Sequence, residues 1–134
     1  MQTIALRLQP DADLRQSLLD YCIAHAIEAA FILSCVGSLR IAEIRFAGCT
    51  DSRHFDEKLE ILSLAGTLSL HGCHLHIAVS DERGQVVGGH LMNGSHIYTT
   101  AEIVLGILPD LAFNRVHDPV TGFKELGIGT SKKS

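Results

Sequence analysis

The chain has 134 residues, of which 46% are hydrophobic and 19% charged, and its formal net charge is −4 at pH 7. This composition is typical of one globular domain with a sizeable core, and it excludes a disordered chain. The negative charge argues against broad attraction to phosphate, which needs clustered lysine and arginine side chains. We therefore expect a single domain over residues 1–134, with a frayed tail at residues 129–134.

The sequence shows no export or membrane signal. Its start lacks the basic residues and the apolar run of a secretory signal. The most apolar stretch, residues 23–36, includes His25 and Glu28 and is shorter than the ~20 residues of a membrane-spanning helix. Four cysteines without metal-type pair spacing are expected to be reduced and mostly buried: Cys22, Cys35, Cys49 and Cys73. These features favour a cytoplasmic protein.

In chain order, alternating apolar residues predict a strand over residues 1–9, and Pro10 marks a break. A helix follows to about residue 28, capped by Asp11 or Asp13. Its apolar residues recur at spacings of three and four and predict one buried stripe: Leu14, Leu18, Leu19, Cys22, Ile23 and Ala26.

The rest of the chain has the residue pattern of strands. A first strand is expected to stop at Gly37, a bulge is expected near Ile41, and residues 48–56 are expected to form an exposed loop or a ragged edge. Beyond a hairpin at residues 73–91, further strands are expected at residues 95–108, 111–116 and 123–128. One N-terminal helix followed by strands predicts an α+β fold with a largely antiparallel sheet of about seven strands.

The hairpin brings histidines together. His74 and His76 are two residues apart, so on a strand both side chains point to the same face. A three-residue loop ending at Gly84 would place His76 directly opposite His90. A bulge at residues 88–89 would shift this register. In the simple register three imidazoles lie close enough to share one ion.

Three neutral imidazoles and a water form the ligand set of many zinc sites, and nitrogen ligands also accept copper, nickel or cobalt. We therefore predict a site for zinc or another divalent transition metal at His74, His76 and His90. The alternative is that these histidines are half-buried sheet residues bonded to their neighbours. His96, at the start of the next strand, is a candidate fourth ligand or supporting group.

Glu60 and Glu102 lie within otherwise apolar strands, and a buried carboxylate needs a partner. Either is a candidate for supporting the site or acting as a general base, and the alternative is an ion pair with Arg40 or Arg45. No serine lies in a nucleophile motif, so catalytic residues stay unassigned and the sequence does not decide whether the protein is an enzyme.

Several segments in a fixed order together resemble the PPC domain, named for its occurrence in plants and prokaryotes. These segments are residues 59–64, Gly66, residues 74–76, residues 81–84, residues 88–91, Gly94 and residues 100–104. The resemblance spans nearly the whole chain. It implies a compact α+β homotrimer, with a zinc-type ion at the histidines matching His74, His76 and His90 in some prokaryotic relatives.

Plant members carry the domain beside AT-hooks, basic arms that enter A·T-rich minor grooves. This sequence has no such arm, and residues 57–62 lack the Gly, Arg and Phe of the plant partner-binding motif. The leading hypothesis is therefore a trimeric metal-binding domain with a three-histidine site for an unidentified small ligand or reaction. The alternative is a DNA-associated or regulatory protein-interaction module without catalytic activity.

Overall fold

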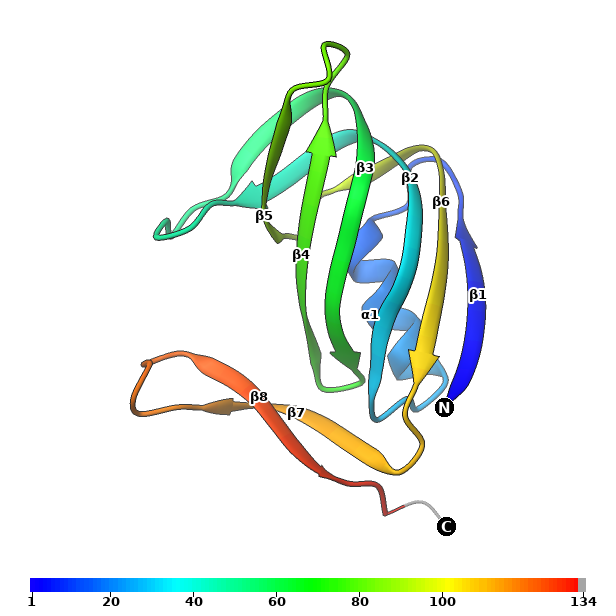
Figure 1. Cartoon of the computed structure of the whole chain (residues 1–134), viewed down its shortest axis with the longest axis vertical. Helices are drawn as coiled ribbons and strands as arrows, with labels where there is room; N and C mark the ends of the chain where they lie inside the picture. The colour runs from blue at the N-terminus through cyan, green and yellow to red at the C-terminus, as the bar shows by residue number, and fades with distance from the viewer. Residues whose placement is uncertain (133–134) are drawn as a thin grey trace.

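The computed structural model describes residues 1–132, which form one helix and eight strands (Figure 1). The elements are β1 (Gln2–Leu8), α1 (Leu14–Ala24), β2 (Ala30–Arg45), β3 (Arg53–Ser69), β4 (Gly72–Ser80), β5 (Val86–Leu91), β6 (His96–Ile107), β7 (Leu111–His117) and β8 (Lys124–Thr130). The predicted frayed tail is wrong for Gly129 and Thr130, which belong to β8, and its last residues, 133–134, lie outside the described residues.

All strand pairs are antiparallel, which confirms the predicted α+β fold. Six strands form one sheet in the order β1-β6-β2-β3-β4-β5. The sheet curls back on itself, because the end of β2 also pairs with β5 through Ile44 with Leu91 and Arg45 with His90. Strands β7 and β8 form a separate two-stranded sheet that projects beneath the lower ends of β3 and β4 in Figure 1.

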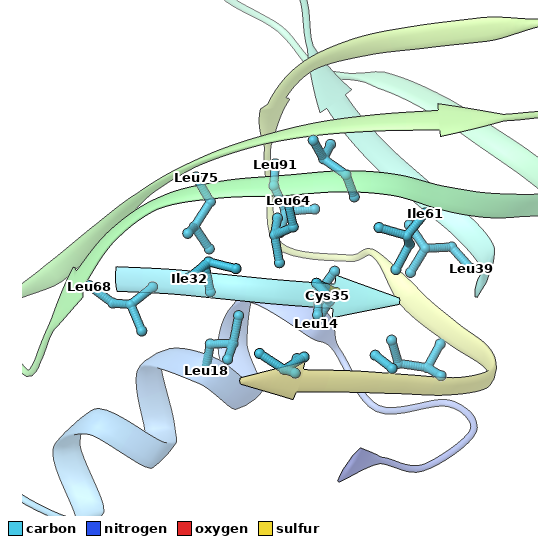
Figure 2. Packing of buried hydrophobic residues seen from close by; sticks show 14 of the residues in the cluster. Leu14, Leu18, Ile32, Cys35, Leu39, Ile61, Leu64, Leu68, Leu75 and Leu91 are labelled. Atoms are coloured by element: carbon cyan, nitrogen blue, oxygen red, sulfur yellow. The ribbon is translucent and has the colours of Figure 1, made fainter. Parts of the chain in front are cut away.

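Helix α1 packs against the concave face of the main sheet. Leu14, Leu18 and Cys22 are fully buried, and Figure 2 shows the two leucines against side chains from the strands. The Asp13 carboxylate caps the helix by accepting a hydrogen bond from the Gln16 N–H at 3.0 Å. The prediction that the helix runs to residue 28 is wrong, because Ala26 adopts a left-handed conformation with φ 51° and ends the helical path.

The predicted stop at Gly37 is also wrong, because β2 runs through this residue. A side chain there would meet the Thr100 carbonyl oxygen of β6 at 2.2 Å, so this glycine allows close strand approach within the sheet. Part of the predicted loop at residues 48–56 is strand, since β3 begins at Arg53. The bulge expected near Ile41 is confirmed by a register shift between Leu39 and Ile41.

Two cysteines behave as core residues. Cys22 and Cys35 are buried, and burial raises the pKa of each thiol to about 11, so both stay protonated at neutral pH. Cys49 is exposed, which departs from the general expectation of burial.

No helix within residues 1–132 is long and apolar enough to cross a membrane.

Candidate metal centre

The predicted register of the β4–β5 hairpin is confirmed. His76 pairs with His90, and the pairing continues without a bulge through Gly89 and Gly88 to the end of the strands. The turn is closed by a hydrogen bond from the Asp81 N–H to the Gln85 carbonyl at 2.9 Å, and Gly84 adopts φ 78° as the short loop requires.

Strand alternation places the three histidines on the outer face of the curled sheet. Leu75 and Ile77 are buried in the core, whereas His74 is half-buried and His76 is exposed. His90 is half-buried and reaches the same face from β5. The ring centroids are 4.9 Å apart for His74 and His76, 4.7 Å for His76 and His90, and 5.3 Å for His74 and His90. One ligand nitrogen from each ring lies within 4.8 Å of the other two.

Two glycines allow neighbouring strands to approach the histidine strands closely. Gly66 of β3 has φ 141°, and a side chain there would come within 2.0 Å of the His74 carbonyl oxygen. Gly89 of β5 lies against β2, where a side chain would meet the Arg45 carbonyl oxygen at 2.6 Å. Close packing of β3 against β4 and of β2 against β5 therefore fixes the strands that carry His74 and His90.

The surroundings favour the neutral form of two of these imidazoles. Burial lowers the pKa of His74, and the nearby His76 and Arg115 lower it further. Burial also lowers the pKa of His90, with a second contribution from Arg45. Neutral imidazole is the form that binds a metal ion, because its nitrogen lone pair is free.

No hydrogen bond joins any of the three rings to another group within residues 1–132. The alternative that these histidines are satisfied by their neighbours therefore has no support in the described part of the chain. Three unbonded imidazoles at this spacing have the donor type and the geometry of a metal site.

His74 and His76 line an open pocket of about 420 Å³, and His90, the third member of the cluster, lies outside its lining. One wall is β3, at Ala65, Gly66 and Thr67, and the opposite wall is the β7–β8 hairpin, at Arg115, Glu125 and Leu126. Neither Arg115 nor Glu125 was predicted from the sequence. Their spacing on a short strand pair does not indicate a binding site, and only the fold shows that this hairpin lies beside β4.

The three supporting residues expected from the sequence lie elsewhere. Glu60 and Glu102 are exposed in the described chain, so the prediction that they are buried is wrong. Neither forms the alternative ion pair, because Arg40 pairs with Asp11, and Arg45 forms no ion pair within residues 1–132. His96 is not part of the histidine cluster, and its Nδ1 lies 3.0 Å from the Asp11 carbonyl oxygen.

The greater part of the chain matches a known family. Residues 1–109 fit the model of the Plants and Prokaryotes Conserved (PCC) domain, which is the family abbreviated PPC above. The chain belongs to this family. Strands β7 and β8 follow the matched region, so the wall that carries Arg115 lies beyond the family model.

Individual relatives extend the comparison. The chain is 50% identical over 123 residues to the bifunctional protein GlmU of Synechococcus sp. strain JA-2-3B'a(2-13), covering 92% of this chain and 20% of that protein. The chain thus spans about a fifth of the length of the curated relatives it matches.

Two solved structures share the fold over nearly the full chain. A hypothetical protein from Salmonella enterica is 40% identical with a TM-score of 0.94, covering 96% of this chain and 94% of its own. The metal-containing protein AF0104 from Archaeoglobus fulgidus is 29% identical with a TM-score of 0.79, covering 93% of this chain and 92% of its own.

Proposed function

We propose that this domain binds a divalent transition metal ion, zinc in the first place, through His74, His76 and His90. The observation that carries the proposal is the convergence of three imidazoles with ligand nitrogens within 4.8 Å of one another and without hydrogen bonds inside residues 1–132. A hairpin that holds three unbonded rings this close can bring one nitrogen from each ring to a single shared ion after side-chain rotation.

The spacing fits zinc after small side-chain rotations. Zinc–nitrogen bonds are about 2.0–2.1 Å long, so two nitrogens on one tetrahedral ion lie roughly 3.3 Å apart. The rings can contract to this spacing because His76 is exposed and the other two are only half-buried. Three protein ligands leave a fourth position open, and we propose that a small ligand binds there.

Likeness to a metal-containing protein supports the proposal. AF0104 shares this fold over nearly its whole length and is described as containing metal. Copper, nickel and cobalt also accept imidazole nitrogen, so the choice of zinc rests on the typical three-histidine site with an open position.

The test is elemental analysis of protein purified without a histidine tag and equilibrated with zinc. We expect one ion per chain in the parent protein and strongly reduced metal in His76→Ala and His90→Ala. His96→Ala is the matched control, because this histidine lies outside the cluster and should retain full metal content. Equal metal content in the parent protein and both cluster variants would overturn the proposal.

We also propose that the protein assembles as a homotrimer. Apolar side chains remain exposed on β2 and β3 of the described chain, with Val36 62% and Leu62 54% exposed. Val36 precedes Gly37 and Leu62 follows Ile61, and Gly37 pairs with Ile61 in the antiparallel register, so Val36 and Leu62 lie side by side on the sheet. Neighbouring exposed apolar residues are typical of a protein–protein contact, and copies of the same chain are the partner that the family resemblance implies.

A mass measurement in solution tests this assembly. We expect a mass near three times 14.5 kDa for the parent protein and a smaller species for Val36→Asp, which places a charge in the proposed contact. The control is Val86→Asp, because Val86 is comparably exposed at 56% but lies on β5. A monomeric parent protein would contradict the proposal.

The alternative function, a DNA-associated or regulatory interaction module, has weaker support. The net charge of −4 opposes contact with phosphates, which is the main source of non-specific DNA affinity. Binding to an A·T-rich duplex at low salt, where phosphate attraction is strongest, would revive this alternative.

A further inference from the structure

Arg115 lies on the wall of the pocket that also contains His74 and His76. It lies on β7 two residues after Phe113, which is buried and anchors the hairpin to the main domain. The Phe113 N–H donates to the Glu28 carbonyl at 2.8 Å, and the Ser69 hydroxyl donates to the Phe113 carbonyl at 2.9 Å. The stem of Arg115 passes over Gly72, the first residue of the strand that carries His74.

The guanidinium of Arg115 has most of its hydrogen-bonding capacity unused. It donates once, from Nη2 to the Lys124 carbonyl at 2.6 Å, although a guanidinium has five N–H donors. Within residues 1–132, no carboxylate lies within ion-pairing distance of Arg115, including Glu125 on the same pocket wall. A half-buried, unpaired cation that lines a pocket is a ready partner for an anion.

The shape and charge of the pocket favour one kind of anion. The planar guanidinium fork matches a carboxylate, which accepts two parallel hydrogen bonds. Glu125 adds a negative charge to the same wall and disfavours a more highly charged anion such as phosphate. Ala65 and Leu126 add apolar surface, which suits a small hydrocarbon body.

We infer that the pocket binds a small organic acid whose single carboxylate pairs with Arg115 while the ligand reaches the open coordination position of the metal at His74, His76 and His90. This inference rests on the proposed metal function and adds to it the chemical class of the ligand. The positive charge of Arg115 attracts and orients the ligand's carboxylate, and the histidine-bound ion supplies the second point of attachment.

The experiment uses the full chain loaded with cobalt(II), whose visible spectrum changes when a ligand enters its coordination shell. Glycolate and lactate are the probes, because each carries a hydroxyl that can reach the ion besides the carboxylate that pairs with Arg115, and the uncharged glycolamide and lactamide are their comparators. Arg115→Gln removes the charge at similar length, and Arg115→Lys keeps the charge without the fork. Arg83→Gln, in the β4–β5 turn away from the pocket, is the control for a change in net charge. Cobalt content is measured separately for every variant.

We expect the carboxylates to change the spectrum in a saturable way and the amides to leave it unchanged. Arg115→Gln should raise the half-saturating concentration at least tenfold, with an intermediate effect for Arg115→Lys and none for Arg83→Gln. Full cobalt content with equal carboxylate binding in the parent and Arg115→Gln would overturn this inference alone. Tighter binding of inorganic phosphate than of either carboxylate would overturn the assigned ligand class. Failure of the parent to bind cobalt would overturn the metal function and this inference with it.

Discussion

The β4–β5 and β7–β8 hairpins are both antiparallel strand pairs, but neighbouring strands support them to very different extents. The β4–β5 hairpin lies inside the main sheet, with β3 on one side and the end of β2 on the other. The β7–β8 hairpin forms its own two-stranded sheet and contacts the main domain near its base, through Phe113 and Ser69. It exposes Phe123, next to its turn, by 71%, and Ile128, which pairs with Phe113, by 67%.

This difference separates the two parts of the pocket. Metal ligands must be positioned closely, and the three proposed ligands lie on the hairpin whose register is fixed by strands on both sides. Arg115 lies on the hairpin with less support, and an isolated two-stranded hairpin is marginally stable in water. The pocket therefore has one rigid wall, which carries the histidines, and one wall on the β7–β8 hairpin, whose local unfolding costs less free energy.

The largest expected effect is on the rigid wall. Gly66→Ala would place a methyl group 2.0 Å from the His74 carbonyl oxygen at φ 141°, so β3 and β4 could not keep their present spacing. We expect a loss of about 4 kcal/mol in the free energy of unfolding and a large loss of metal affinity. Urea denaturation and elemental analysis measure the two effects.

Gly84→Ala is the matched control for this substitution. Gly84 also has a positive φ, 78°, but nothing lies within 4 Å of an added methyl group. The expected cost is about 1 kcal/mol, from backbone strain alone. Similar losses in the two variants would show that strand approach at Gly66 is not what holds the histidine wall.

These two walls also mark what the sequence can and cannot predict. The histidine register followed from the spacing of His74 and His76 and from a short loop ending at Gly84, because hairpin geometry is local. The pocket wall formed by Arg115 and Glu125 did not, because it depends on where β7 packs after a long path through β6. Local patterns determine strand pairing, whereas contacts between separate sheets depend on the folded core.

Glu60 and Glu102 show a second limit of sequence reasoning. An acidic residue among apolar ones suggested burial, yet both side chains point to the exposed face of their strands. The sequence contains nearly continuous apolar stretches because β2 and β3 have buried residues on one face and exposed apolar residues, such as Val36 and Leu62, on the other. Periodicity cannot distinguish such a face from a core.

The less supported wall is tested by Phe113→Ala. Removing this buried side chain, which is 7% exposed, should cost about 3 kcal/mol, with the loss concentrated in the β7–β8 hairpin. We expect faster amide exchange and proteolysis in residues 111–130 and unchanged metal content. Phe123→Ala, at an exposed site on the same hairpin, should have little effect. Loss of metal in Phe113→Ala would show that the histidine wall depends on this hairpin.

Metal binding should stabilise the rigid wall specifically. At free zinc equal to one hundred times the dissociation constant, we expect the free energy of unfolding to rise by about 2.7 kcal/mol. Amide exchange should slow most in β4 and β5 and least in β8. His76→Ala should show no zinc-dependent gain, and the same gain in that variant would place the ion elsewhere.

The smallest expected effect is a pH dependence of the metal-free protein. In the folded state the pKa values of His74 and His90 lie below the ordinary value of about 6.5, because burial disfavours their charged forms. The unfolded chain therefore binds more protons, so stability is full above about pH 6.5 and falls as pH decreases toward the lowered pKa values.

His90→Gln tests this dependence by removing one of the two groups. Urea denaturation between about pH 7.5 and 5.5 should show a smaller decline in the variant than in the parent protein. The Glu43 carboxyl does not contribute in this range, because hydrogen bonds from Ser52 and His54 lower its pKa below its ordinary value of 4.5. An unchanged decline in His90→Gln would mean that protonation outside the histidine cluster controls the acid sensitivity. The expected decline links the two properties of the rigid wall, since the burial that disfavours imidazolium also keeps the lone pairs available to a metal ion.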